Sequence, residues 1–168
     1  QQILPKINKS VITYGTKNGA DFQLTNITFS EGQTFFEIRH KKAIRQFQLQ
    51  IPGIHNALNA TGVIALLVSL GINISNIKKH LATFIGTKRR FELITNKKGK
   101  LFFDDYAHHP AEIVATIQAC KQWFPHKKLL VVFQPHTYTR TIALLDRFAS
   151  SFQGADIVLL TEIYASAR

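Results

Sequence analysis

Apolar and polar residues alternate over short stretches in the first third of the chain. Between Asp21 and Gln50 the apolar positions form three such stretches, separated by turn-forming residues at 31–32 and 40–42. Alternation of this kind is typical of strands that bury one face. The pattern therefore predicts an antiparallel meander of about three strands, which ends at Pro52-Gly53.

Two helices are predicted after the meander. Asn56 opens a helix that is apolar on most sides, runs through Leu70 and ends at Gly71. A helix with apolar residues on most sides is expected to be buried. Ser75 is predicted to cap a second helix, which carries Ile77 on an apolar face and basic residues on the other.

After a basic connector at residues 86–90, the pattern changes to an alternation of strands and helices. Strands are predicted at 101–105, 129–133 and 157–160, and a domain boundary is expected within 91–101. The helices between them carry two apolar stripes, formed by Ile113, Ile117, Cys120 and Phe124 and by Ile142, Leu145, Ala149 and Phe152. This order predicts a parallel βαβαβ unit, so the expected fold class is α/β.

Composition limits the class of protein. The chain has 168 residues, of which 45% are hydrophobic, so it is large enough for one domain or two small ones. Its longest mainly apolar run, Val63 to Leu70, is too short to cross a bilayer, and we expect no membrane insertion. The single cysteine, Cys120, cannot close an internal disulfide and is expected to be an inert core thiol, which fits a cytoplasmic location.

The chain is strongly basic, with 21 Lys and Arg against 10 Asp and Glu and a formal net charge of +11. A positive field favours polyanionic partners such as nucleic acids, nucleotides and phosphorylated sugars, and charge alone does not choose among them. A nucleic-acid reader would interleave basic and aromatic residues along one face, which this sequence does not do. No G-x-x-x-x-G-K-[ST] phosphate loop is present.

Three polar loops follow the predicted parallel strands, at residues 104–109, 134–140 and 161–168. In an open α/β sheet such loops lie at the carboxyl edge, where ligands bind. We therefore expect a composite polar site built from these loops.

The first loop contains Asp104, Asp105, His108 and His109 within six residues. This density permits a metal site, since carboxylate and imidazole are common ligands. The favoured alternative is that Asp105 accepts hydrogen bonds from a ligand hydroxyl such as ribose and that His109 caps the helix ahead of Pro110. We assign no metal ligand in this chain.

Two further groups of residues have both a functional and a structural interpretation. Arg140 is suited to grip a substrate carboxylate, because a cation at a helix start opposes the dipole and needs another reason to be there. His55, Asn56 and Asn59 open the first helix, where the two amides either pair with an adenine or serve as cap and packing residues. Lys88, Arg89 and Arg90 either neutralise phosphate oxygens or form a solvated connector.

Taken together, four ordered segments resemble motifs of the Mur ligases. They are Gly53–Ala60, Gly86–Glu92, Asp104–Pro110 and Phe133–Thr141. Members of this family have a UDP-sugar domain, a central ATPase domain and a Rossmann-like C-terminal domain. The resemblance implies that residues 1–93 are the end of the central domain and that residues 94–168 are most of the C-terminal one.

The resemblance implies an ATP-dependent amide ligase of peptidoglycan synthesis. In the implied reaction ATP and Mg²⁺ phosphorylate the lactyl carboxylate of UDP-N-acetylmuramate, and the amine of L-alanine attacks the acyl phosphate. The phosphate loop and the metal ligands are expected ahead of Gln1, so we expect the 168 residues alone to be inactive. The alternatives are a sibling ligase for another amino acid or peptide and, in a different class, a basic nucleic-acid-binding module.

Site residues carried over by motif fall into a nucleotide group and an amino-acid group. The resemblance implies that adenine is bound by His55, Asn56 and Asn59, the terminal phosphate by Arg90, and the ribose by Asp105.

The amino-acid group consists of Tyr106, His108 and Arg140, which the resemblance places around the incoming L-alanine. His108 and Arg140 are the catalytic candidates, with His108 orienting or deprotonating the attacking amine. Thr137 departs from the pattern, because some members have an arginine there.

Overall fold

The computed structural model describes residues 6–30 and 32–165. It divides into two compact units, of which the first holds residues 1–50 and 54–84 and the second holds residues 51–53 and 85–168. Residue 31 of the first predicted turn and residues 166–168 of the third predicted loop lie outside the described residues.

The first unit contains a four-stranded sheet in the order β1-β2-β3-β4. The antiparallel strands are β2 (Phe22–Ser30), β3 (Gln33–His40) and β4 (Ala43–Leu49), which confirms the predicted meander. A bulge in β2 falls at Asn26, whose φ is +41° and whose amide nitrogen donates to the Glu37 carboxylate at 2.6 Å. The parallel strand β1 (Tyr14–Gly15) has only two residues and leaves no pattern in the sequence.

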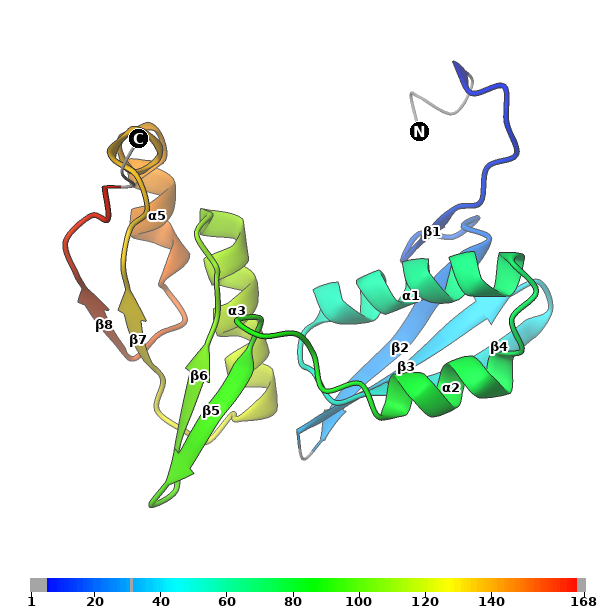
Figure 1. The fold of residues 1–168 in the computed structure, drawn as a ribbon, viewed down its shortest axis with the longest axis horizontal. Coiled ribbons are helices and arrows are strands. Elements are labelled where there is room, and N and C mark those ends of the chain that lie inside the picture. The colour runs from blue at the N-terminus through cyan, green and yellow to red at the C-terminus, as the bar shows by residue number, and fades with distance from the viewer. Residues whose placement is uncertain (1–5, 31, 166–168) are drawn as a thin grey trace. The chain divides into compact units, whose positions relative to one another are not determined.

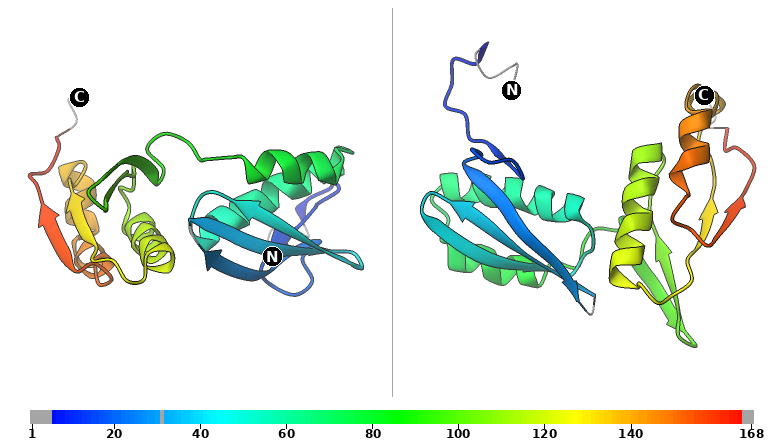
Figure 2. Two further views of the ribbon diagram at one scale, coloured as in Figure 1. Left: turned by 90° about the horizontal axis from the view of Figure 1, so that it is seen from below. Right: turned by 180° about the vertical axis from the view of Figure 1, so that it is seen from behind.

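Two helices, α1 (Ile54–Ser69) and α2 (Ile74–Ala82), cover one face of this sheet (Figures 1 and 2). The prediction that the first helix is buried on most sides is wrong for this chain, because Leu66 of α1 is 59% exposed. Ser75 is not the cap of α2. The cap is Asn73, whose side chain accepts a hydrogen bond of 2.8 Å from the Ser75 N–H.

The core of the first unit lies between the helices and the sheet. Its buried apolar side chains come from both layers and are Phe22, Leu24, Phe36, Ile38, Phe47, Leu49, Ala57, Ala60, Ile64, Ala65 and Ile77. Three of the buried residues of α1 are alanines, whose small side chains allow the helix to pack closely on the sheet.

The second unit begins with a hairpin of β5 (Glu92–Lys97) and β6 (Lys100–Asp104), which pair antiparallel. The segment 91–101, predicted as a boundary, thus contains a strand. The hairpin is followed by α3 (Pro110–Trp123), and then by β7 (Leu130–Phe133) and β8 (Ile157–Leu160), which pair in parallel. The mixed α/β class is confirmed, but the hydrogen-bonded parallel ladder consists of β7 and β8, while β6 bonds to β5.

The single helix predicted between the last two strands is two helices, α4 (Tyr138–Ala143) and α5 (Leu145–Ser151). Leu144 separates them with φ −121° and ψ 19°. The predicted stripe is wrong in part: Phe152 packs against the core, but Ile142 and Leu145 are 74% and 61% exposed, and Phe148 is buried instead. Because Leu144 and Leu145 are adjacent, a helix in this segment has two possible apolar faces. The break at Leu144 buries the face that carries Phe148, which the periodicity of the sequence did not favour.

Helix α3 packs against β7 and α5 to form the core of this unit. The core side chains are Ile113, Ile117, Phe133 and Phe148, and Ala107 of the loop after β6 packs against them. The loops that follow β6, β7 and β8 lie at the same end of the unit (Figure 1). Among the described residues, no helix has the length and apolarity needed to cross a bilayer.

Candidate functional site

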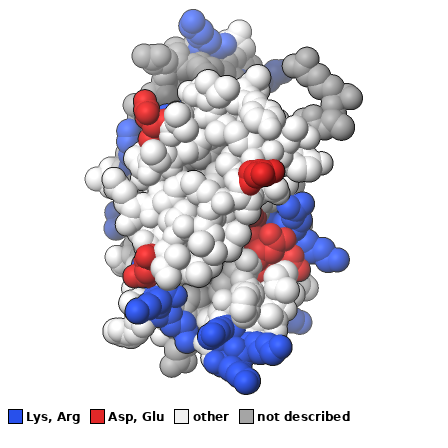
Figure 3. Space-filling view, turned by 90° about the vertical axis from the view of Figure 1, so that its left-hand side faces the viewer, with Lys and Arg blue, Asp and Glu red and all other residues white. Residues whose placement is uncertain are grey.

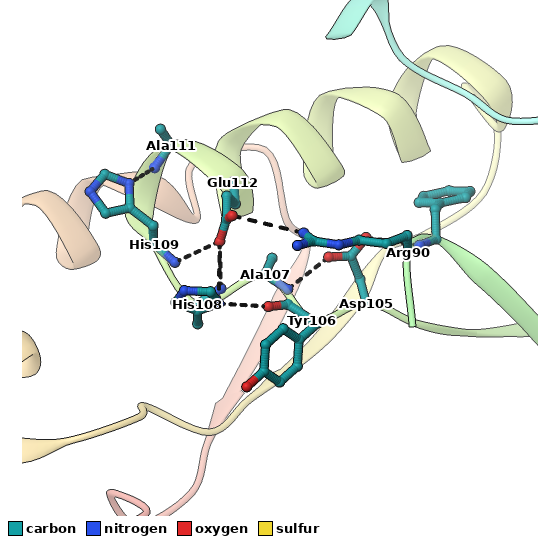
Figure 4. A network of polar contacts seen from close by, with 9 residues as sticks. Arg90, Asp105, Tyr106, Ala107, His108, His109, Ala111 and Glu112 are labelled. Carbon is teal, nitrogen blue, oxygen red and sulfur yellow. Dashed lines mark hydrogen bonds and ion pairs between the residues drawn. The ribbon is translucent and has the colours of Figure 1, made fainter. Parts of the chain in front are cut away.

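Asp105 joins the loop after β6 to the residues that precede β5. One of its carboxylate oxygens accepts the N–H of Phe91 at 2.9 Å, and the other accepts the N–H of Ala107 at 2.8 Å (Figure 4). Burial raises the pKa of Asp105, although both N–H groups and the charge of Arg90 oppose this shift. Each oxygen keeps a second lone pair, so the carboxylate can still accept a hydrogen bond from a ligand hydroxyl.

Glu112 is the centre of the polar network at the start of α3. Its Oε2 accepts the backbone N–H groups of His108 at 2.9 Å and His109 at 3.1 Å. Its Oε1 lies 3.8 Å from the Arg90 guanidinium (Figure 4). Burial raises the pKa of Glu112, but the two N–H groups, His108 and Arg90 outweigh burial and hold the pKa below its ordinary value.

The functional position of Glu112 is not predicted in the sequence analysis, although a helix-capping motif indicates it. The helix cap is His109, and Glu112 is the third residue after it, which is the spacing of a capping box. The box uses a histidine in place of the usual Ser or Thr, so a search for the common motif passes over it.

His108 and His109 are adjacent but have different roles. Nδ1 of His108 lies 2.9 Å from the carbonyl oxygen of Tyr106, which can only accept, so this nitrogen carries the proton. The other ring nitrogen, Nε2, is then the basic one when the imidazole is neutral. His109 accepts the Ala111 N–H on its Nδ1 at 3.3 Å, which confirms its interpretation as a cap.

A metal site is not formed by these side chains. Within the described residues, no group of three or more His, Cys, Asp and Glu is arranged to hold a metal ion. The carboxylates of Asp105 and Glu112 instead accept backbone N–H groups, which orders the loop.

Arg89 and Arg90, which the sequence grouped together, contact different partners. The Arg89 guanidinium lies 4.6 Å from the ring centre of Tyr106, and its Nε is 3.4 Å from the Asp104 carboxylate. The Arg90 guanidinium faces Glu112 instead. The structure therefore brings Arg90, Asp105, Tyr106 and His108, all predicted from the sequence, into one network with Arg89 and Glu112.

Arg140 lies in the second loop region, on α4. Its side chain is half-buried and has no hydrogen bond or ion pair within the described part of the chain. It is the third residue of this six-residue helix, close to the junction with the second loop where the sequence argument placed it. An unpaired, half-buried guanidinium at the loop end of the unit is suited to bind a carboxylate.

Thr137 and its neighbours connect the second and third loops. Thr137 has a φ of +66°, and its N–H donates to the carbonyl of Tyr164 at 3.0 Å. Tyr164 donates in turn to the carbonyl of Pro135 at 2.8 Å, and its ring stacks on His136 with centres 5.4 Å apart. These contacts, which the sequence did not predict, fix the loop that precedes Arg140.

The three adenine candidates belong to the first unit. His55, Asn56 and Asn59 lie in the first two turns of α1, where His55 and Asn59 are exposed and Asn56 is half-buried. Both asparagines are therefore accessible to a ligand, at least in part.

Basic side chains of the second unit form a further group at the tip of the β5–β6 hairpin. Figure 3 shows Lys and Arg side chains concentrated at the lower end of the drawn face, where Figure 1 places the tip of the β5–β6 hairpin. Lys97, Lys98 and Lys100 belong to this hairpin, and Lys127, from the α3–β7 connection, donates to its Gly99 carbonyl at 3.2 Å.

Comparison with known families gives two matches that follow each other along the chain. The Mur ligase middle domain matches residues 1–67, and the Mur ligase, glutamate ligase domain matches residues 89–167.

Known proteins agree with this result. A UDP-N-acetylmuramate--L-alanine ligase of Alkaliphilus metalliredigens is 48% identical over 99% of this chain and 36% of its own length. The crystal structure of a UDP-N-acetylmuramate-alanine ligase from Thermotoga maritima superposes with a TM-score of 0.81 at 33% identity, over 91% of this chain and 34% of that one. A MurF ligase of the same organism in complex with ADP shares the fold, with a TM-score of 0.73 and 23% identity over 89% of this chain and 34% of that chain. This chain thus spans about a third of the length of its relatives.

Proposed function

The chain belongs to the Mur ligase family, and we propose that it is part of an ATP-dependent ligase that joins L-alanine to UDP-N-acetylmuramate in peptidoglycan synthesis. The identity of 48% to a ligase of that name supports this specificity. The observation that carries the chemistry is the orientation of His108, which leaves Nε2 as its basic nitrogen beside the exposed Tyr106. On its own, we propose, this chain is inactive.

His108 is proposed as the residue that accepts a proton from the amino group of L-alanine. An amino acid is mostly an ammonium ion near pH 7, and it must lose a proton before its nitrogen can attack a carbonyl carbon. The Tyr106 carbonyl fixes the proton on Nδ1, and the Glu112 carboxylate, 3.5 Å from the same nitrogen, stabilises the imidazolium that forms. The proton therefore goes to Nε2.

Arg140 and Tyr106 are proposed to hold the amino acid. The guanidinium binds the α-carboxylate through two parallel hydrogen bonds, because its planar fork matches a carboxylate. The side chain of L-alanine is one methyl group, for which the exposed ring of Tyr106 offers an apolar surface.

The nucleotide residues are proposed to contact ATP. We propose that His55, Asn56 and Asn59 contact the adenine, that Asp105 accepts from the ribose, and that Arg90 contacts the terminal phosphate. The 3.8 Å pair of Arg90 with Glu112 is long enough for a phosphate to compete with it. ATP supplies the phosphoryl group that activates the carboxylate of the sugar substrate. Within the described residues no group of three or more His, Cys, Asp and Glu is arranged to hold a metal ion, so we assign no ligand here and keep Mg²⁺ as a proposed cofactor.

Other properties of the protein stay predictions. We propose a cytoplasmic location with no nucleic-acid partner and no membrane insertion, on the basis of the single cysteine and the sugar-nucleotide substrate. The domain division between residues 93 and 94 also stays a prediction.

The test uses the full-length protein that contains this chain. His108→Ala and Arg140→Ala should raise the KM for L-alanine, and His108→Ala should also lower kcat. His126→Ala and Arg147→Ala are matched controls, because both residues are exposed and lie outside the polar loops in the sequence. Unchanged kinetics for L-alanine in both site variants would refute the assignment, and a panel of amino acids identifies a sibling activity.

A further inference from the structure

Arg89 holds Tyr106 by both its side chain and its backbone. The guanidinium carbon lies 4.6 Å from the centre of the Tyr106 ring, which is within the range of a cation–π interaction. The Arg89 carbonyl oxygen accepts the backbone N–H of Tyr106 at 2.8 Å. Asp104 orients the same guanidinium through its Nε at 3.4 Å. Tyr106 is thus fixed at two points by one residue that lies 17 positions earlier.

The backbone of Arg89 is in a conformation that needs support. Its φ is +57°, and Phe91, two residues later, has a φ of +52°. Non-glycine residues adopt such angles only where surrounding contacts impose them, and they concentrate at functional sites. Here the Arg89 N–H donates to the Glu92 carboxylate at 2.8 Å, and the Phe91 N–H donates to Asp105 at 2.9 Å. The strained turn directs the Arg89 side chain toward Tyr106 and that of Arg90 toward Glu112.

The position of Tyr106 affects His108 directly. The two rings meet edge to face, with centres 5.2 Å apart and planes at 62°. The carbonyl oxygen of Tyr106 also fixes the proton on His108 Nδ1 at 2.9 Å. A displacement of Tyr106 would therefore move both the proposed amino-acid surface and the carbonyl oxygen that orients the proposed base.

We propose that Arg89 is a positioning residue that determines the affinity for the amino acid substrate by clamping the ring of Tyr106. This inference rests on the proposed function, because it gives Arg89 a role at the same amino-acid site. From the sequence alone, Arg89 either contacts phosphate or belongs to a solvated connector, and neither alternative gives it this role. Its side chain faces Tyr106 and Asp104, which leaves Arg90 as the residue for phosphate.

The first experiment measures kinetics in the full-length protein. Arg89→Gln should raise the KM for L-alanine by about two- to fivefold, which corresponds to about 0.5–1 kcal/mol for an exposed cation–π contact. The KM for ATP should stay unchanged. Arg89→Lys keeps the charge over the ring and should restore part of the affinity. Lys88→Gln removes a neighbouring exposed charge, and it serves as the control.

The second experiment tests the clamp without any turnover. The sample is the 168-residue chain, labelled with ¹³C in its tyrosine rings. This chain has four tyrosines and so gives four sets of ring signals, one of which is assigned by Tyr106→Phe. Arg89→Gln should shift the Tyr106 signal and leave the other three in place, while Lys88→Gln should shift none. Intact signals from the other tyrosines show that the variant is folded.

The outcomes separate the inference from the proposed function. If the wild-type protein does not use L-alanine, the proposed function fails. If it does use L-alanine but Arg89→Gln leaves that KM unchanged, or raises the KM for ATP instead, the inference about Arg89 is overturned. An unmoved Tyr106 signal in Arg89→Gln overturns the clamp itself.

Discussion

The Asp105 carboxylate accepts a hydrogen bond of 2.9 Å from the backbone N–H of Phe91, and the φ of Phe91, +52°, is unusual for a residue with a large side chain. The Phe91 ring is 8% exposed and packs against Phe103 and Trp123, with ring centres 4.5 and 5.9 Å away. The hydrogen bond therefore anchors an aromatic cluster to the polar loop. The same acid that the sequence assigns to a ligand also stabilises the fold.

We predict that Asp105→Ala lowers the free energy of unfolding by roughly 1–3 kcal/mol, because two backbone N–H groups lose their acceptor. Asp105→Asn should lie between the wild type and Asp105→Ala, since an amide has only one oxygen to offer. Urea unfolding of the 168-residue chain measures both. Asp104→Ala is the control, and its more exposed ion pair should contribute less than about 1 kcal/mol. Equal effects of the two alanine variants would contradict the proposed anchor.

Glu112 should make stability depend on pH in the acid range. Its pKa is held below the ordinary value of 4.5, so the ionised form stabilises the folded state above that value. This contribution is lost as the pH falls through the lowered folded-state pKa. We predict that Glu112→Gln is less stable than the wild type at pH 7 and that the difference shrinks below about pH 4.5. Urea midpoints of both proteins between pH 7 and pH 3 give the comparison, and a constant difference would disprove the coupling.

The sequence predicts the first unit better than the second for a physical reason. Strands β2 to β4 bury one face, and so their side chains alternate in polarity. Strand β5 has the sequence Glu-Leu-Ile-Thr-Asn-Lys, and all but its first residue are exposed. Without a buried face a strand leaves no periodic pattern, so the sequence indicates a boundary at β5 rather than a strand.

The polar site is likewise predictable from the sequence only in part. A dense group such as Asp104 to His109 is visible in the sequence, and its position after a strand predicts that it forms a site. The different partners of Arg89 and Arg90 are not visible, because they depend on positive φ angles at Arg89 and Phe91. Such angles in non-glycine residues result from tertiary contacts, which local sequence does not encode.

The docking of β1 on α1 can be tested through Gly62. A Cβ atom added there would lie 2.8 Å from the Tyr14 ring, so Gly62→Ala forces the ring to move. Alanine is also the better helix former by about 0.5–1 kcal/mol. We predict that Gly62→Ala is more favourable by at least about 0.5 kcal/mol in a Tyr14→Ala background than in the wild type. A double-mutant cycle from urea unfolding measures this, and additive effects would mean that Tyr14 does not pack on α1.

Cys120 should be unreactive in the folded chain. Burial raises the pKa of its thiol to about 12, and the charge of Asp105 adds to the shift while Lys121 opposes it. Only the thiolate reacts quickly with iodoacetamide, so at pH 8.5 the folded protein should be alkylated at least tenfold more slowly than the same chain in urea. Because the chain has one cysteine, mass spectrometry gives the rate without interference from other thiols. Equal rates in buffer and in urea would mean that the thiol is accessible and that α3 does not pack as described. An Ile117→Ala variant, which opens the core beside α3, should react faster than the wild type and provides the positive control.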